Sequence, residues 1–97
     1  MKTKTISQTG FLITGVADLT LWGGDNGCIE MTPFEVDAPT EENILANLND
    51  GGFGTQSING AICDIWEYYE TGYKERVRTL GVGTISHETQ NYYNYNS

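Results

Sequence analysis

The stretch Ala61–Gly83, AICDIWEYYETGYKERVRTLGVG, predicts one long β-hairpin, and the rest of the fold builds outward from it. Thr71-Gly72 supplies the turn, because glycine adopts a positive φ without a steric clash at Cβ. With these two residues as the loop, the predicted register pairs Tyr69 with Lys74, Glu67 with Arg76, Trp66 with Val77 and Ile65 with Arg78. Directly opposed residues share a face. One face then carries Ile62, Trp66, Tyr68 and Val77, and the other carries Glu67, Tyr69, Lys74, Arg76 and Arg78, with Cys63, Ile65 and Leu80 toward the far end.

The hairpin holds three of the chain's five cations, and they leave two interpretations open. The first is an ordinary solvated face, because exposed ion pairs contribute only ~0–1 kcal/mol and occur freely. The second is an anion-binding strip flanked by tyrosines. The candidate ligand-binding residues are Tyr69, Tyr73, Lys74, Arg76 and Arg78.

One aspartate is expected on the apolar face of the hairpin, and it needs hydrogen-bond partners if that face is buried. Asp64 alternates with Ile62 and Trp66, so it shares their face. A buried carboxylate needs hydrogen-bond partners. Thr79, directly opposite in the predicted register, is the natural first donor.

The acidic residues are concentrated in one part of the chain. Thirteen acids against five bases leave a formal charge of −8 on 97 residues, a length typical of one domain. Residues 25–50 contain no Lys or Arg. This run indicates either simple solubility or a surface that imitates a nucleic-acid backbone and docks on a basic protein groove. Direct binding to nucleic acid is not expected, because that affinity depends on cations that neutralise phosphates. The candidate partner-binding residues are Glu35, Asp37, Glu41, Glu42 and Asp50.

Conventional catalytic and metal-binding sets are not expected. Cys28 and Cys63 lack the paired short spacing of a zinc site, and one histidine, His87, does not complete it. A Cys–His nucleophile pair is the only conventional combination, and Cys63 falls at a packed strand position. We therefore expect a non-enzymatic protein with no catalytic residues, no metal and no cofactor.

The sequence predicts neither export nor insertion into a membrane. Its start, MKTKTISQTG, is positively charged but lacks an apolar run of signal-peptide length. No segment approaches the ~20 apolar residues that span a bilayer. These features predict a cytoplasmic protein with no membrane partner and two free, mostly buried thiols. A disulfide between Cys28 and Cys63 would require their two strands to be neighbours.

Before the hairpin, the sequence predicts a second hairpin and then a helix. Residues 11–22 form a β-rich run, and the turn 23–27 contains Asn26-Gly27, which suits a type I′ turn. The returning strand meets Pro33, which cannot donate to a ladder, so this strand is expected to lie at an edge or to break there. A helix is predicted over 40–49, capped by Thr40 and with its apolar stripe on the sheet.

The expected fold class is α+β, with a small antiparallel sheet of two hairpins (four to five strands) and one short helix packed on one face. Residues 1–86 form this single domain. Residues 87–97 are expected to be a polar Tyr/Asn-rich tail, either disordered or stacked on a partner. Open sheet edges make a homodimer or higher oligomer plausible. The expected core is Leu12, Leu19, Leu21, Ile29, Met31, Ile44, Leu45, Leu48, Ile62, Trp66, Val77 and Val82.

Two runs, LTLWGGDNGCIEM (19–31) and DIWEYYETGYKERVRT (64–79), resemble small uncharacterised acidic proteins carried by phages and conjugative elements of gut bacteria. The resemblance is one of style and segment order over roughly residues 8–80, and it assigns no functional residue. Small acidic proteins of such elements often bind and block host defence machinery. The resemblance thus implies an inhibitor that acts by binding a host protein.

Three function classes follow from these observations. The first is an acidic binding protein of a mobile element, an anti-defence inhibitor that blocks the basic nucleic-acid-binding groove of a host protein. The second is an oligomeric nucleotide-binding protein that sequesters an anionic signal, with Arg76 and Arg78 on phosphate and tyrosines on the base. The third is a structural or accessory module of a larger assembly.

Overall fold

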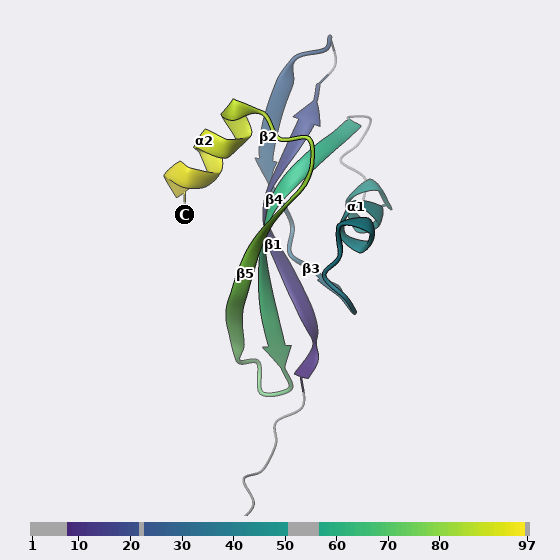
Figure 1. Ribbon diagram of the computed structural model, residues 1–97, viewed down its shortest axis with the longest axis vertical. Coiled ribbons are helices and arrows are strands. Elements are labelled where there is room, and N and C mark those ends of the chain that lie inside the picture. Colours follow the sequence, from purple (N-terminus) through teal and green to yellow (C-terminus); the bar gives the residue numbers. More distant parts are fainter. Residues whose placement is uncertain (1–7, 22, 51–56, 97) are drawn as a thin grey trace, which may run out of the picture.

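The body of the molecule is a five-stranded antiparallel sheet, seen in the computed structural model of Figure 1. Residues 8–21, 23–50 and 57–96 are described. The elements are β1 (Gln8–Thr20), β2 (Asn26–Glu30), β3 (Phe34–Val36), α1 (Glu41–Asp50), β4 (Ser57–Tyr69), β5 (Lys74–Gly83) and α2 (His87–Asn96). The strand order is β2-β1-β4-β5, and β3 pairs with the N-terminal part of β1. The α+β class and the antiparallel sheet are confirmed, but the expectation of a single helix is wrong.

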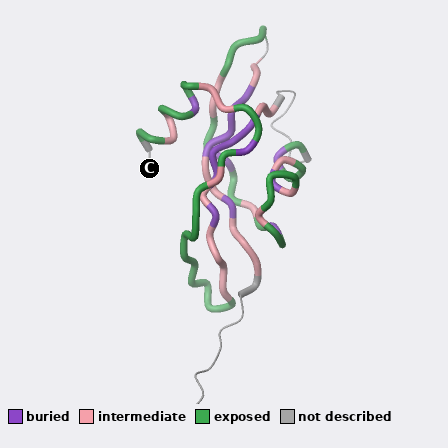
Figure 2. The backbone as a smooth tube through the Cα atoms, in the orientation of Figure 1, coloured by how far each residue is buried: buried purple, intermediate pink, exposed green. Residues whose placement is uncertain are grey.

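The hydrophobic core lies between α1 and one face of the central strands β1 and β4 (Figure 2). Ile13 faces Ile65 across these strands, and Ala17 faces Ala61; all four are fully buried. The prediction placed the face of Ile62 in this core. In the structure, the other face of β4, with Ala61, Cys63 and Ile65, is turned toward α1. It enters the core because its residues lie opposite the apolar face of β1. The core cluster comprises Ile13, Ala17, Leu19, Met31, Val36, Ile44, Leu48, Ala61, Cys63, Ile65 and Val82.

The expected core residues therefore have mixed outcomes. Six of them are buried in the structure: Leu19, Met31, Ile44, Leu48, Ile62 and Val82. Four are half-buried: Leu12, Leu21, Leu45 and Trp66. Ile29 and Val77 are exposed at 43% and 44%, so their assignment to the core was wrong. Both lie on outer strands of the β2-β1-β4-β5 order.

The outer edge formed by β2 and β3 breaks at Pro33, as predicted from the missing N–H of proline. β2 pairs with residues 16–20 of β1, and β3 pairs with residues 11–13. Between them, the Met31 N–H donates to the Gly15 carbonyl at 2.8 Å. Gly15 has φ +139°, and a Cβ there would collide with the Ile62 carbonyl oxygen, so only glycine lets β1 lie this close to β4.

The turn between β1 and β2 does not use Asn26-Gly27. Among the described residues of this loop, Gly23 and Gly24 have a positive φ, and Leu21 donates its N–H to the Asp25 carbonyl at 2.7 Å. Asn26 is the first residue of β2. The type I′ prediction was wrong because two preceding glycines adopt positive φ at no steric cost.

The register of the long hairpin changes halfway along it. Near the core, Ile65 pairs with Arg78 as predicted, and Cys63 pairs with Leu80. Near the turn, Trp66 pairs with Arg76 and Glu67 with Glu75, one residue away from the prediction. The loop closes between Tyr69 and Tyr73 and so holds three residues, with Gly72 at φ +87°. A β-bulge at Val77 absorbs the extra residue and restores the register beyond it.

Helix α1 forms and docks as the sequence predicts. The Thr40 hydroxyl oxygen accepts from the Asn43 N–H at 3.1 Å, which is an N-cap contact. Ile44 and Leu48 lie one turn apart and are buried in the core cluster. Phe53, expected to follow the helix into the core, lies outside the described residues.

Helix α2 occupies most of the segment that was expected to be a tail. Ser86 precedes it as N-cap, and the Thr89 N–H donates to the Ser86 hydroxyl oxygen at 3.3 Å. The helix lies against β1, β2 and β4, on the other side of the sheet from α1 (Figure 1). The prediction failed because α2 has no apolar stripe; its inner face carries hydroxyl groups.

Candidate functional site

The predicted partner-binding acids gather around β3 and the start of α1. Glu35, Asp37 and Glu42 are exposed. Glu35 and Asp37 line a shallow depression of ≈ 290 Å³ together with Val36, Asn43 and Asn47. Carboxylates beside amide groups form a surface rich in hydrogen-bond acceptors, which suits the cations of a partner.

Two of the predicted acids differ from this group. Glu41 is exposed, but its Oε2 accepts from the Gly83 N–H at 2.8 Å and so ties α1 to the end of β5. Asp50 ends α1, and its side chain lies outside the described part of the structure. We use the name α1 acids for Glu35, Asp37 and Glu42.

The predicted cation strip is divided between the two faces of the sheet. The bulge at Val77 turns Arg76 and Arg78 to opposite sides. Arg76 Nη1 lies 3.7 Å from Asp64 Oδ1, on the α2 side, whereas Arg78 Nη2 donates to the Pro39 carbonyl at 3.2 Å, next to α1. A single chain therefore does not present both guanidinium groups to one phosphate.

The remaining members of the strip are also separated. Lys74 Nζ lies 4.7 Å from the ring centroid of Trp66, on the side of Arg76. Tyr69 and Tyr73 face the other way, with ring centroids 5.8 Å apart. The Tyr69 hydroxyl donates to Glu67 Oε1 at 2.9 Å, and this hydrogen bond raises the pKa of Tyr69.

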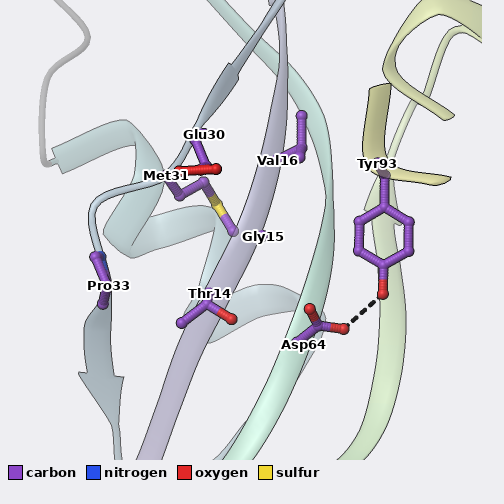
Figure 3. A pocket seen from close by; sticks show the side chains of 8 residues that line it. All are labelled: Thr14, Gly15, Val16, Glu30, Met31, Pro33, Asp64 and Tyr93. Atoms are coloured by element: carbon purple, nitrogen blue, oxygen red, sulfur yellow. Dashed lines mark hydrogen bonds between the residues drawn. The ribbon is translucent and has the colours of Figure 1, made fainter. Parts of the chain in front are cut away.

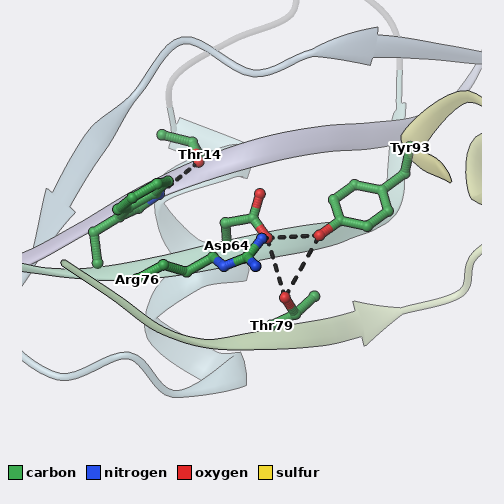
Figure 4. Close-up of polar contacts among 6 residues, drawn as sticks. Thr14, Asp64, Arg76, Thr79 and Tyr93 are labelled. Atoms are coloured by element: carbon green, nitrogen blue, oxygen red, sulfur yellow. Dashed lines mark hydrogen bonds and ion pairs between the residues drawn. The ribbon is translucent and has the colours of Figure 1, made fainter. Parts of the chain in front are cut away.

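Asp64 is the centre of a polar cluster under α2 (Figure 4). Its Oδ1 accepts from the Tyr93 hydroxyl at 2.6 Å and from the Thr79 hydroxyl at 3.1 Å. The Thr79 partner was predicted from the register and is confirmed. Tyr93 was not predicted, because residues 87–97 were not expected to fold back. Burial and the hydrogen bond to Asp64 raise the pKa of Tyr93.

A shallow groove lies beside this cluster, between α2 and the β2–β3 edge (Figure 3). Its volume is ≈ 290 Å³, and β1 forms its floor with Thr14, Gly15 and Val16. The walls are completed by Glu30, Met31, Pro33, Asp64 and Tyr93. The Thr14 hydroxyl at its margin accepts from the Trp66 indole N–H at 2.9 Å.

Asp18 is a buried carboxylate that the sequence analysis did not single out. It is 1% exposed and accepts from the Ser86 N–H at 2.8 Å and the Thr89 hydroxyl at 2.7 Å. The Asn59 amide donates to its other oxygen at 2.8 Å. Burial alone raises the pKa of Asp18, but the hydrogen bonds from Asn59, Ser86 and Thr89 outweigh it and lower the pKa to about 2. In the sequence, only its position between Ala17 and Leu19 in a predicted strand pointed to a buried carboxylate.

The cysteines lack the electrostatic setting of a nucleophile. Burial raises the pKa of the Cys63 thiol to about 12. Burial, Asp18 and Glu88 raise the pKa of Cys28. Both thiols are free. Reactive cysteines need the opposite shift, toward the thiolate.

The described ranges contain no group of three His, Cys, Asp or Glu side chains placed to hold a metal ion. Neither α1 nor α2 has the length and apolar character needed to cross a membrane. Comparisons with protein-family models, curated proteins and solved structures found no match for this chain. The functional proposal therefore depends on the geometry and charge of the side chains.

Proposed function

We propose that this protein is a non-enzymatic binding protein that docks the α1 acids on a basic surface of a partner protein. The observation that carries this proposal is the exposure of Glu35, Asp37 and Glu42 around one depression and one helix start, in a part of the chain without Lys or Arg. Residues 25–50 contain no Lys or Arg, and in the described part of the chain these three carboxylates make no ion pair; Arg78, which comes close to α1, donates to the Pro39 carbonyl instead.

The partner we propose is a protein whose basic groove binds nucleic acid. A row of carboxylates can occupy such a groove in place of phosphates, since both offer anionic oxygens to Arg and Lys. The formal charge of −8 accelerates encounter with a basic surface and opposes nonspecific binding to nucleic acid. In this role the protein acts as an inhibitor of its partner. We propose that the partner belongs to the defence machinery of a bacterium that a phage or conjugative element has entered.

Charge reversal of the α1 acids tests this function. The variant Glu35→Lys/Asp37→Lys/Glu42→Lys leaves Glu41 in place, because Glu41 holds the end of β5. The tagged protein is used to capture partners from a bacterial lysate, and the captured proteins are eluted with duplex DNA. We expect the wild type to retain a DNA-binding protein that duplex DNA releases, and the triple variant to lose at least ~10-fold in affinity for it.

The matched control is Asp25→Lys/Glu70→Lys/Glu88→Lys, three exposed acids outside the α1 region. Both triple variants change the formal charge from −8 to −2. The control should retain the partner. Equal loss in the two variants would show that only net charge matters, and equal retention would show that the α1 acids are not the interface.

A further inference from the structure

The end of the long hairpin extends beyond both helices (Figure 1). We define the tip as residues 66–77. None of these residues is buried, whereas residues 60–63 of the same hairpin all are (Figure 2). The tip nevertheless carries large aromatic side chains, including Tyr73, which is 59% exposed. Helix α2 reaches only the Arg76 end of the tip, where Arg76 and Tyr93 both contact Asp64, so the aromatic residues of the tip need another surface if they are to be buried.

The register divides the tip into two sides of opposite charge. Trp66 pairs with Arg76, and Tyr68 pairs with Lys74, so one side combines aromatic rings with two cations. We call it the cation side. The carboxylate side, on the opposite face, comprises Glu67, Tyr69, Tyr73 and Glu75.

The carboxylate side has an electrostatic cost that the predicted register would have avoided. Glu67 lies directly opposite Glu75, and like charges in this position are destabilising. The Tyr69 hydroxyl donates a hydrogen bond to Glu67, but none of the described cations of the hairpin lies on this side to neutralise the two carboxylates. Lys74 and Arg76 are on the cation side, and Arg78 reaches Pro39. Cations on an incoming surface would relieve this pair.

We propose that the cation side of one copy docks on the carboxylate side of a second copy. Each side carries two aromatic residues. The cation side adds two positive charges and the carboxylate side adds two negative charges, so the two sides are complementary. Packed sheet faces lie about 10 Å apart, a distance that interdigitated aromatic side chains fill. Contact between two like sides would bring two cations or two carboxylates together, and therefore the interface is head-to-tail.

Pairing of β5 strands from two copies is a less suitable arrangement. In an antiparallel pair centred on Val77, Arg76 of one copy would lie opposite Arg78 of the other. Cations on an edge strand are a common defence against such pairing. The formal charge of −8 also opposes approach at long range, but salt screens this repulsion beyond about 10 Å at 0.1 M, whereas the contact pairs are closer.

Single charge reversals with mixing provide the test. Lys74→Glu damages only the cation side, and Glu75→Lys damages only the carboxylate side; both residues are exposed. Sedimentation velocity across a dilution series at physiological salt should show concentration-dependent self-association of the wild type. Each variant alone should associate about 10-fold more weakly. The equimolar mixture should recover a wild-type interface, because the Glu75→Lys chain keeps its cation side and the Lys74→Glu chain keeps its carboxylate side.

The outcomes separate this inference from the proposed function. The triple variant of the α1 acids should self-associate at least as well as the wild type, because the tip is unchanged. Circular dichroism of each variant establishes that it is folded. A wild type that stays monomeric at every concentration overturns the inference, and so do single variants that associate as strongly as the wild type or a mixture that behaves like its components.

Discussion

The two helices are attached to the same sheet by different forces. Helix α1 buries Ile44 and Leu48 in the apolar core, 0% and 3% exposed. Helix α2 is attached largely through hydroxyl groups and its N-terminus: Thr89 and the Ser86 N–H bind Asp18, and Tyr93 binds Asp64. An apolar stripe is visible in a sequence, whereas a hydroxyl becomes an anchor only where the fold supplies an acceptor.

The comparison also shows how a buried carboxylate can be accommodated. In a capping box, a Glu or Gln three residues into the helix accepts from the N-cap N–H. In α2 that position is Thr89, and Asp18 from β1 accepts from the Ser86 N–H instead. One carboxylate thus completes the cap and holds the helix on the sheet. The three strong hydrogen bonds to Asp18 offset the cost of burying its charge.

The largest expected effect is at the apolar attachment. Ile44→Ala should reduce the free energy of unfolding by about 3 kcal/mol, because a fully buried side chain is replaced by a cavity. Urea denaturation gives the value. The matched control is Leu45→Ala on the same helix, a half-buried position where the loss should be clearly smaller. Equal losses at the two positions would contradict an attachment of α1 through buried apolar side chains.

The next effect is a pH dependence at the polar attachment. The pKa of Asp18 is about 2 in the folded chain against an ordinary 3.8, so protonation favours unfolding. Its contribution, about 2 kcal/mol, should be complete above about pH 4 and should disappear as the pH falls toward 2. Asp18→Asn should be destabilised by this amount at pH 7, and urea denaturation should show the two proteins converging near pH 2.

Asp25→Asn is the control for the pH measurement, since Asp25 is exposed in the β1–β2 turn. It should follow the wild type at every pH. A constant difference between wild type and Asp18→Asn from pH 7 to pH 2 would exclude the ionised carboxylate as the source of the stability.

The smallest effect is at the far end of α2. Tyr93→Phe removes one hydroxyl that donates to Asp64 and should cost about 1 kcal/mol. Hydrogen exchange should show the loss first as faster exchange within α2, with α1 protected as before. Tyr95→Phe is the matched control, because Tyr95 is 89% exposed and its hydroxyl should not contribute. Unchanged exchange in Tyr93→Phe would mean that the hydrogen bond to Asp64 does not help to hold the helix.

Much of the fold was predictable because its signals are local. The Thr40 cap, the apolar stripe of α1, the break at Pro33 and the Asp64–Thr79 contact all follow from neighbouring residues or from one strand pairing. The hairpin register near its turn was not predictable in this way. A two-residue and a three-residue loop both place glycine at a positive φ, and only the bulge at Val77 reconciles the longer loop with the pairing near the core.

The candidate site was predicted in part. Glu35, Asp37 and Glu42 are exposed, as expected, and Glu35 and Asp37 line one depression. The cations were expected on one face, and the bulge separates Arg76 from Arg78. The burial of Asp18 was not predicted, because the sequence around an aspartate in a strand does not show whether its carboxylate is exposed or buried.

By itself, the sequence determined the acidic character, the antiparallel sheet with its long hairpin, and helix α1, since each arises from composition or from a period shared by nearby residues. The tertiary structure alone decided the face of β4 that enters the core, the register of the tip, and the folding of α2 onto the sheet. The contacts that hold α2 join residues 68, 71 and 29 positions apart. Hydrogen bonds of this kind require both partners to be in place, and only the assembled sheet brings Asp18 and Asp64 to the helix.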